Sequence, residues 1–548
     1  MPIHISKDTV IKILLLMVIA LAVRLIHFEH TTFGYDQARD GFMALEIFGK
    51  DPIKLIGPST DIGGLFHGSL YWYIISPAYF LSQGNPLPVK LYHTILQLGM
   101  IPLSYFIALR MTRKKEYAFL TAILMTFSIE AVQYSRWMSN PSFALFSVSL
   151  FFFGLWEVLN KKTYGLGLMM LMWAFSVQLQ LFLIYLFPFL CYAMWKVIRD
   201  KGIKSLFSPF NVAMAVCAGL LFIPFLASEI KFNLQGTRSL LGYLTSSSLA
   251  EGPGFFQKMF KFAGSLSKNV FYNILGIHKT LAHVLTISGV GYIAYSIFKK
   301  QPLYKEKIFL LMWLCAPALI YPIESNNSYF LNIGNLVPLL ILTVIILSEI
   351  TEKIHISYKT LFIHTALGII IISNLYFITT LNIQGESLFS VQKGVDLYQE
   401  KRVIDWMYAD SQGKDFAFNT ITNPLFINTT WAYLFDTYGR QTYGSVPDWT
   451  GDPIDGRYAG ADVVFSETGL KVGNHLYLIV EPGPGIPDIY LPAYYIFENR
   501  RSKLLEERTF GEIKVQKRRI TEIHHFSKDD VFNIALELRK KKRTITVQ

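Results

Sequence analysis

Long apolar runs separated by short polar segments fill the first 380 residues of the chain. A helix that crosses a bilayer needs about 20 largely apolar residues, and most of the runs approach this length. The pattern therefore predicts a polytopic α-helical membrane protein with about eleven transmembrane helices. The expected helices cover residues 9–28, 87–109, 116–133, 141–159, 163–177, 179–195, 209–228, 273–298, 307–323, 329–349 and 358–380.

Two longer segments interrupt this alternation and are predicted to form outer loops. Residues 29–86 contain semi-apolar stretches such as Leu70–Leu81, a pattern typical of helices that lie along a membrane surface. Residues 229–272 hold scattered charges, including Glu251, and the sequence Gly-Pro-Gly at 252–254. A loop longer than about 15 residues is usually functional or disordered, so we interpret this segment as one or the other.

From about residue 386 onward the chain resembles an ordinary soluble sequence. We therefore predict a membrane domain over residues 1–385 and a separate domain over residues 386–548. Helical and strand-like patterns alternate in the second domain, which favours a small α/β fold. Its expected helices are Lys401–Ala409 and Pro424–Tyr438, its strands Asp415–Thr420 and Leu476–Val480, and its hairpin Glu507–Arg518 with a turn near Gly511.

Basic residues predict how the chain is oriented in the membrane. Clusters of Lys and Arg at 110–115, 161–162, 196–204 and 299–307 follow the second, fourth, sixth and eighth expected helices. All four clusters fall on the cytoplasmic side if the N-terminus is cytoplasmic, as the positive-inside rule requires. An odd number of helices then places the α/β domain outside. We expect a multi-pass protein of the cell membrane with an extracytoplasmic C-terminal domain.

The composition agrees with this picture and argues against a nucleic-acid partner. Charged residues make up 16% of the chain, against about 25% in soluble domains. The net charge of +12 is explained by cytoplasmic loops, since no basic stripe with interleaved aromatic residues appears on a soluble element. The three cysteines, Cys191, Cys217 and Cys315, lie in apolar stretches without disulfide or metal spacing.

The sharpest chemical signal is an acidic segment directly after the first expected helix. Carboxylates beside a membrane are commonly just solvated, but here Asp36 could act as a general base while the other reactant stays in the lipid. Arg39 could orient that carboxylate or bind a phosphate. Asp40 would share a face with Asp36 in a helix and could be its partner, a metal ligand or a cap. The segment reads Tyr35-Asp36-Gln37-Ala38-Arg39-Asp40, with Tyr35 as a candidate substrate contact.

A glycine-rich segment, residues 57–73, carries two further candidates, Asp61 and His67. Glycine permits tight turns and a close approach of the backbone to a ligand. Either side chain could bind a divalent metal or an acceptor. The plainer alternative is an interfacial loop with a hydrogen-bonded histidine. The sequence leaves metal dependence open, because it contains no His-rich zinc pattern.

Cations on the expected outer side could hold a phosphate group. Arg136 lies at the outer end of the third helix, where it could bind a lipid-linked phosphate or simply extend to the surface. Glu130 in the same helix end could pair with Arg136 or face the loop. The weaker phosphate-binding candidates are Lys231 and Arg238. The polar loop that begins at Glu324 adds Ser328 and Tyr329 as candidate substrate contacts, unless it only connects two helices.

Together these motifs resemble the GT-C superfamily of membrane glycosyltransferases, above all the protein O-mannosyltransferases and the lipid A aminoarabinose transferase. Asp36 matches the leading acid of the family motif that follows the first helix. Arg39 matches an arginine of the aminoarabinose-type version, whereas Gln37 replaces the usual second acid. Asp36 is therefore the strongest candidate for the base.

Two later segments carry the rest of the resemblance, which covers about residues 9–350. Ser135-Arg136 matches a Ser-Arg pair near the end of the third helix, with Asn140 where the family often has aspartate. The stretch from Tyr329 to Pro338 is similar to a family segment in which a basic residue stands in place of Ser328.

The resemblance implies that a sugar moves from a polyprenyl-phosphate donor to a lipid, glycan or protein acceptor at the outer face. With a single base, Asp36, it implies inversion at the anomeric carbon. The expected location agrees, because nucleotide sugars are cytosolic and the candidate residues are predicted to lie outside. The alternatives are a transporter or lipid-linked sugar flippase, and a sensor whose outer domain binds a ligand. Transporters often show buried charges and inverted repeats, neither of which is evident here.

Overall fold

The computed structural model describes residues 6–245, 254–276, 278–323, 328–353, 355–451 and 471–546, and it divides into two compact units. We call them the helical unit and the α/β unit. Two pieces of the first predicted outer loop group with the C-terminal residues. The helical unit comprises Met1–Ile26, Ile53–Ile74 and Leu91–Thr380, and the α/β unit comprises His27–Pro52, Ile75–Lys90 and Leu381–Gln548.

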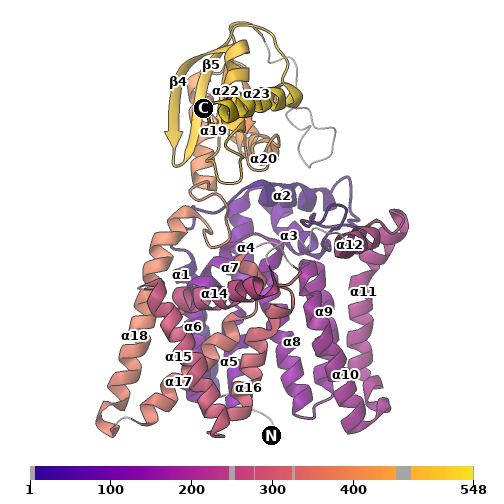
Figure 1. Cartoon of the computed structure of the whole chain (residues 1–548), viewed down its shortest axis with the longest axis vertical. Helices are drawn as coiled ribbons and strands as arrows, with labels where there is room; N and C mark the ends of the chain where they lie inside the picture. The colour runs from indigo at the N-terminus through magenta and orange to yellow at the C-terminus, as the bar shows by residue number, and fades with distance from the viewer. Residues whose placement is uncertain are drawn as a thin grey trace. The chain divides into compact units, whose positions relative to one another are not determined.

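Helices account for the apolar part of the chain, and each of the eleven predicted ranges overlaps one of them (Figure 1). The matching helices are α1 Lys7–Arg24, α4 Pro86–Gln97 with α5 Met100–Thr112, α6 Lys115–Phe127 with α7 Ile129–Arg136, α8 Ala144–Leu159, α9 Tyr164–Leu179, α10 Phe187–Lys201, α11 Pro209–Lys231, α15 Lys279–Phe298, α16 Tyr304–Cys315, α17 Leu336–Glu352 and α18 Ile356–Leu381.

The described part of the chain contains six helical stretches that are long and apolar enough to cross a membrane, or seven if the bent α6–α7 pair is one span. This confirms a multi-pass helical membrane protein. The remaining predicted ranges hold helices that are shorter or more charged. For example, α16 has 12 residues, and the 18 residues of α1 include four charged ones.

A bend of 56° separates α6 from α7, where the sequence pattern predicts one continuous helix over 116–133. Ser128 lies at the bend, and its Oγ accepts a hydrogen bond from the amide of Ala131 and donates one to Oδ1 of Asn273. The amide of Ile129 donates to Oδ1 of Asn374 on α18. Two asparagines therefore bind backbone and side-chain groups that the bend releases from the helix, as an apolar environment requires.

The second predicted outer loop, residues 229–272, is largely helical in the structure. The helix α11 continues to Lys231, and two more helices follow, α12 Gln235–Thr245 and α14 Phe255–Asn273. These residues therefore form helices where the sequence pattern predicts a loop. Polar side chains on the buried face of α14 lower its hydropathy and hide it from an apolar-run search. Glu251, Gly252 and Pro253 lie outside the described residues.

The first predicted outer loop contains the helices α2 Tyr35–Ile47 and α3 Leu70–Leu81, as the semi-apolar pattern predicts. In the α/β unit, α2 packs against the helix α20, Thr429–Leu434. A Cβ atom on Gly41 would lie 2.7 Å from the ring of Tyr433, so only glycine fits there. The Tyr433 hydroxyl donates to the carbonyl oxygen of Gly84 at 2.7 Å.

Buried polar contacts join the segment after α1 to C-terminal residues within the same unit. Glu386 accepts hydrogen bonds from the amide of Thr32 at 2.7 Å and from the Thr31 hydroxyl at 3.2 Å. The Lys90 ammonium lies 3.4 Å from the other oxygen of Glu386, and both side chains are fully buried. These contacts explain why α2 folds as part of the α/β unit.

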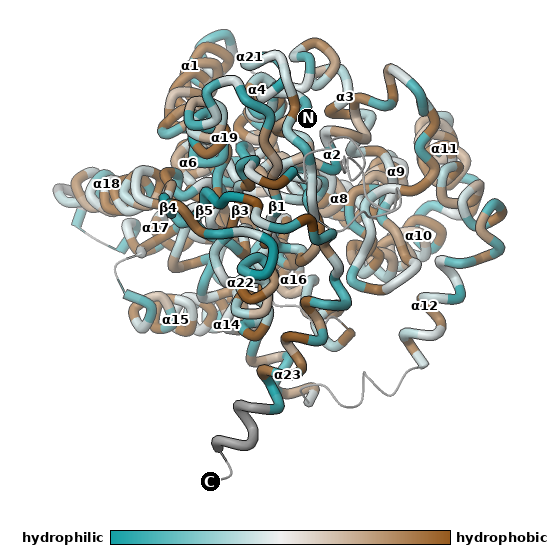
Figure 2. Tube along the Cα trace, turned by 90° about the horizontal axis from the view of Figure 1, so that it is seen from above, coloured by the Kyte–Doolittle hydropathy of each residue, from teal (hydrophilic) through white to brown (hydrophobic). Residues whose placement is uncertain are grey.

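The α/β unit is built on a five-stranded mixed sheet in the order β2-β1-β3-β5-β4, and Figure 2 shows β4, β5, β3 and β1 side by side. β1 is parallel to β2 and β3, and β5 is antiparallel to both β3 and β4. The predicted strands and hairpin are confirmed, including the turn at Gly511, whose φ is +56°. The strands are β1 Ala417–Ile421, β2 Asp448–Trp449, β3 His475–Val480, β4 Ser502–Phe510 and β5 Ile513–Ile520.

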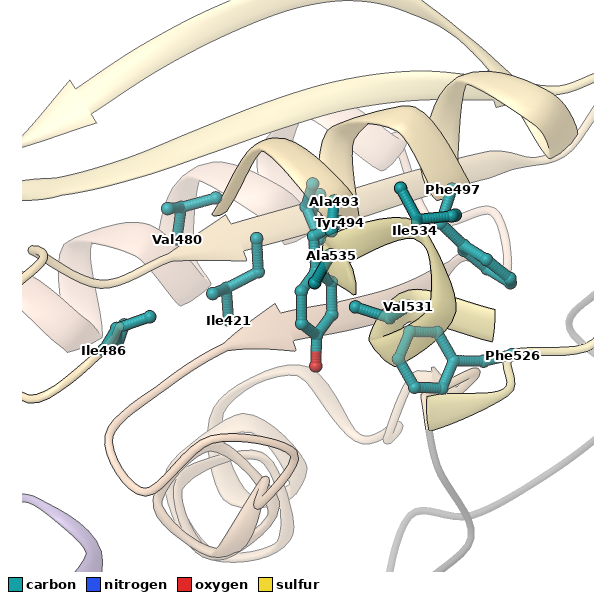
Figure 3. Packing of buried hydrophobic residues seen from close by; sticks show 11 residues of the cluster. Ile421, Val480, Ile486, Ala493, Tyr494, Phe497, Phe526, Val531, Ile534 and Ala535 are labelled. Carbon is teal, nitrogen blue, oxygen red and sulfur yellow. The ribbon is translucent and has the colours of Figure 1, made fainter. Parts of the chain in front are cut away.

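Three longer helices complete this unit: α19 Leu397–Ser411, α22 Tyr490–Arg501 and α23 Lys528–Thr546. The helix α19 confirms the helix predicted at Lys401–Ala409. In the range 424–438, where one helix is predicted, α20 starts only at Thr429 and continues as a π-helix over Phe435–Gly439. Figure 3 shows the core, in which Tyr494 and Phe497 of α22 and Val531 of α23 pack with Ile421 and Val480 of the sheet.

A buried ion pair crosses the interior of this unit. Glu498 accepts hydrogen bonds from Nε and Nη2 of Arg501 at 2.9 and 2.7 Å, and both side chains are fully buried. The amide of Asn419 on β1 donates to the same carboxylate at 2.8 Å. Arg501 also donates to the carbonyl oxygens of Thr450 and His524. The pair therefore links α22 to the central sheet and to the loop before α23.

Candidate functional site

The predicted acidic segment forms the first turns of α2. Gln37 accepts a hydrogen bond from the amide of Gly34 at 3.0 Å and so caps the start of the helix. Arg39 donates through Nη1 to Asp36 at 2.7 Å, and through Nε and Nη2 to Asp40 at 3.1 and 2.8 Å. The helical spacing brings the three charged side chains together as the sequence predicts. Gln37, which stands in place of the family's second acid, caps the N-terminal end of α2.

The two carboxylates in this group differ in exposure. The Asp36 side chain is 60% exposed, whereas that of Asp40 is 2% exposed. Burial alone would lower the pKa of the Arg39 guanidinium, but the charges of Asp40 and Asp36 outweigh it and raise that pKa above its ordinary value. The guanidinium also lies 5.3 Å from the ring centroid of Tyr35. Of the two roles considered for Arg39, its contacts support the orientation of Asp36.

In the helical unit, Glu130 and Tyr329 meet although 199 residues separate them. The Tyr329 hydroxyl donates to Oε2 of Glu130 at 3.0 Å. The amide of Asn273, at the end of α14, donates to the same oxygen at 2.9 Å. The Glu130 side chain is fully buried, and its hydrogen bonds go to Tyr329 and Asn273. Ser328 directly precedes the short helix Tyr329–Asn332.

Arg136, at the end of α7, is fully buried, which contradicts the alternative that it extends to the surface. Its Nη1 donates to the carbonyl oxygens of Arg24 and Ile26, at the C-terminal end of α1. A cation is favoured there because a helix C-terminus carries partial negative charge.

The glycine-rich segment folds back on itself. The amide of Gly57 donates to the carbonyl of His67, and that of His67 donates to the carbonyl of Pro58. A Cβ atom on Gly57 would lie 2.1 Å from the carbonyl oxygen of Gly68, so the close approach that needs glycine is one between two backbone segments. Asp61 is exposed at the tip of this turn.

His67 accepts a hydrogen bond from the amide of Leu181 through Nδ1 at 3.1 Å and borders a cavity of about 190 Å³. Apolar side chains form most of its wall, and Glu229 at the end of α11 adds a carboxylate. Lys231 and Arg238 lie nearby in sequence, are exposed, and do not line this cavity. Among the residues with described positions, no three His, Cys, Asp or Glu side chains are grouped to hold a metal ion.

Sequence reasoning missed the polar groups of α14 and the carboxylate of Glu229. The apolar-run search passes over α14, but asparagines at 269 and 273, four residues apart in an amphipathic pattern, are a signal that could have found its buried face. Glu229 reads as an ordinary loop charge in the sequence.

The comparisons with known proteins give one match in sequence and matches in fold. The sequence model of the dolichyl-phosphate-mannose-protein mannosyltransferase family matches residues 10–234. A search of curated proteins finds no match. In fold, the chain is similar to ArnT from Cupriavidus metallidurans bound to undecaprenyl phosphate, with 11% identity, a TM-score of 0.56, and coverage of 93% of this chain and 98% of ArnT. The apo state of ArnT gives 10% identity, a TM-score of 0.57 and the same coverage. The resemblance to GT-C glycosyltransferases is thereby confirmed.

Proposed function

We propose that this chain is a GT-C membrane glycosyltransferase that moves a sugar from a polyprenyl-phosphate donor to an acceptor. The observation that carries the proposal is the family-model match over residues 10–234, which includes Asp36, Arg39 and Arg136. The fold likeness to ArnT agrees, and one ArnT structure holds undecaprenyl phosphate. The family is described by a lipid-linked sugar, dolichyl-phosphate-mannose, so a donor of that class is the economical choice for this chain.

Asp36 is proposed as the general base. The acceptor oxygen attacks the anomeric carbon, its proton passes to the Asp36 carboxylate, and the bond from that carbon to the phosphate oxygen breaks. Polyprenyl phosphate leaves with the electron pair of that bond, and a single displacement inverts the anomeric configuration. Support comes from the exposure of Asp36 and from its bond to Arg39, which holds one carboxylate oxygen and leaves the other for the acceptor.

Arg136 is proposed to neutralise the donor phosphate, with Lys231 and Arg238 as weaker candidates. Replacing Arg136 by lysine keeps the charge but loses the planar fork that binds two phosphate oxygens. We expect the Arg136→Lys protein to bind donor about 10–100-fold more weakly, as the loss of a charge-assisted bond implies.

The matched control for Arg136→Lys is Arg110→Lys. Arg110 pairs with Glu157 and Tyr164 and is not proposed to touch the donor, so its variant should bind donor normally. Donor binding to detergent-solubilised protein is the measurement, with size-exclusion profiles to verify folding. Equal donor affinity in both variants would remove Arg136 from the phosphate site.

The acceptor is proposed to enter the cavity beside His67. Its wall is mostly apolar with a few polar groups, which is typical of a site for an amphipathic ligand. A lipid, a glycan or a protein segment are the acceptor classes in question. Asp61 and His67 would then contact the acceptor. A metal role for Asp40, Asp61 or His67 has no cluster of ligands to support it in the described ranges.

The finer topology is also a proposal: eleven membrane-spanning helices, a cytoplasmic N-terminus and an extracytoplasmic α/β domain in the cell membrane. It rests on the four basic clusters that agree on one orientation. Reporter fusions should give cytoplasmic signals at Lys115 and Lys204 and an external signal at Gln392. A cytoplasmic signal at Gln392 would reverse the proposed side of the α/β domain.

The direct test of the function is an assay of the purified protein with polyprenyl-phosphate sugars. The transferase should release polyprenyl phosphate only when an acceptor is present, and the product should carry the inverted anomeric linkage. A transporter or flippase would move the lipid-linked sugar across liposomes without releasing polyprenyl phosphate. A panel of mannose, glucose and arabinose donors would also identify the sugar.

A further inference from the structure

Polar side chains line the buried face of α14 inside the helical unit. Ser265, Asn269 and Asn273 follow one another at four-residue spacing and so share one face of the helix. Asn273 binds Glu130 on α7, and the Ser265 hydroxyl lies 3.0 Å from the hydroxyl of Tyr321. The Tyr321 hydroxyl is in turn 3.3 Å from Oδ1 of Asn332. We call Glu130, Asn269, Asn273 and Asn332 the amide–carboxylate cluster.

Several polar atoms of this cluster have no hydrogen-bond partner among the described residues. They are Oε1 of Glu130, both Oδ1 and Nδ2 of Asn269, and Nδ2 of Asn332, and each side chain is at most 1% exposed. An unsatisfied buried polar group costs about 1–3 kcal/mol, and such groups are uncommon in folded proteins. Three neighbouring residues with unused bonding capacity indicate that a ligand completes the hydrogen bonds.

The chemistry of the unused atoms selects the ligand. Oε1 of Glu130 and Oδ1 of Asn269 accept hydrogen bonds, whereas the two Nδ2 amide groups donate them. A sugar hydroxyl both donates and accepts, so neighbouring hydroxyls of one ring match this mixed set. A phosphodiester does not, because its oxygens only accept hydrogen bonds and would face the acceptor oxygens of Glu130 and Asn269. The rings of Tyr272 and Tyr329, with centroids 6.0 Å apart, add an aromatic edge beside the cluster.

The position of Glu130 on α7 relates the cluster to the donor. Glu130 and Arg136 are six residues apart on one helix, which corresponds to about 9 Å along its axis. This is the scale of a sugar ring attached to a phosphate. We infer that the amide–carboxylate cluster binds the hydroxyl groups of the donor sugar, an inference that rests on the proposed transferase function and on the phosphate role of Arg136.

The Asn269→Leu variant separates a binding role from a structural one. Leucine has a similar shape and removes a side-chain amide that makes no hydrogen bond among the described residues, so thermal stability should stay the same or rise. Affinity for the glycosylated donor should fall about tenfold or more, while affinity for bare polyprenyl phosphate should not change. Asn374→Leu is the matched control, because that amide binds Ile129, Asn273 and Ile370 and its loss should lower stability.

The measurement is binding of dolichyl phosphate and of its mannose, glucose and arabinose derivatives to the full-length protein, together with the melting temperature. The inference is overturned if Asn269→Leu weakens bare and glycosylated lipids equally, or lowers the melting temperature as much as Asn374→Leu does. It is also overturned if the unmodified protein binds no derivative more tightly than dolichyl phosphate.

Two further outcomes distinguish a failure of this inference from a failure of the proposed transferase function. If sugar-dependent binding is lost in Asn269→Leu but no protein releases polyprenyl phosphate, the sugar subsite stands and the transferase proposal fails. If the variant raises only the KM for the acceptor and leaves donor binding unchanged, the cluster does not hold the donor sugar and the inference is wrong as stated.

Discussion

The Asp36→Asn protein is expected to fold normally and to lose turnover by about 10²–10⁴-fold, the usual contribution of a positioned general base. The change preserves the shape of the side chain and removes its ability to take the acceptor proton. Folding should survive because Asp36 is largely exposed and its partner Arg39 keeps Asp40. Turnover with saturating donor is the measurement, and size-exclusion chromatography in detergent reports on folding.

Asp40→Asn is the control that the structure supplies for this prediction. Asp40 binds the same arginine but is buried, so its loss leaves the buried Arg39 charge with a single, exposed partner. This variant should lower thermal stability and retain turnover per folded molecule. Near-normal turnover in Asp36→Asn would contradict the assignment of the base and direct the search to Asp40 or Asp61.

The Glu498→Gln protein is expected to lose about 3–5 kcal/mol of stability in the α/β unit, as the removal of one partner of a buried ion pair does. The Arg501 guanidinium would remain fully buried without a countercharge, and the link from Asn419 on β1 would weaken. Hydrogen exchange of the β3 amides in the full-length protein measures the local free energy of opening.

A second variant in the same unit shows whether burial of the ion pair causes the expected loss of stability. Asp436 and Arg440 form an ion pair at 2.6 Å with side chains that are 31% and 55% exposed. Exposed pairs contribute about 0–1 kcal/mol, so Asp436→Asn should barely change exchange of the β3 amides. Similar losses in Glu498→Gln and Asp436→Asn would show that burial of the pair is not what makes it stabilising.

The apolar pattern is enough to predict most helices of the helical unit and every strand of the sheet except the two-residue β2. Residues Leu476–Val480 of β3, for instance, form an unbroken apolar stretch that is buried, and a glycine at 511 indicates the hairpin turn because glycine tolerates the positive φ found there. The helix α14 escapes the same reasoning. Its buried face carries Asn269 and Asn273. Asn273 is hydrogen-bonded to Glu130 of α7, a partner that is distant in sequence and is found only from the fold.

In the candidate site too, contacts within one helix could be predicted from the sequence, whereas contacts between distant segments could not. The spacing of Asp36, Arg39 and Asp40 on a helix fixes their contacts, so the sequence predicts that group. The bond between Glu130 and Tyr329 depends on chain segments that no local pattern relates. The burial of Arg136 likewise follows from where α1 ends in space, and it excludes the alternative that this side chain extends to the surface.

The bend between α6 and α7 has a consequence for biogenesis. Ser128 and Ile129 find their polar partners at Asn273 and Asn374, which are 145 and 245 residues further along the chain. Residues 115–136 leave the ribosome long before either asparagine is made. During that interval an unbroken helix satisfies more backbone groups in the bilayer than a bent one does. The segment is therefore expected to insert straight and to bend only when α14 and α18 arrive, so this part of the protein matures only after α18 has been made.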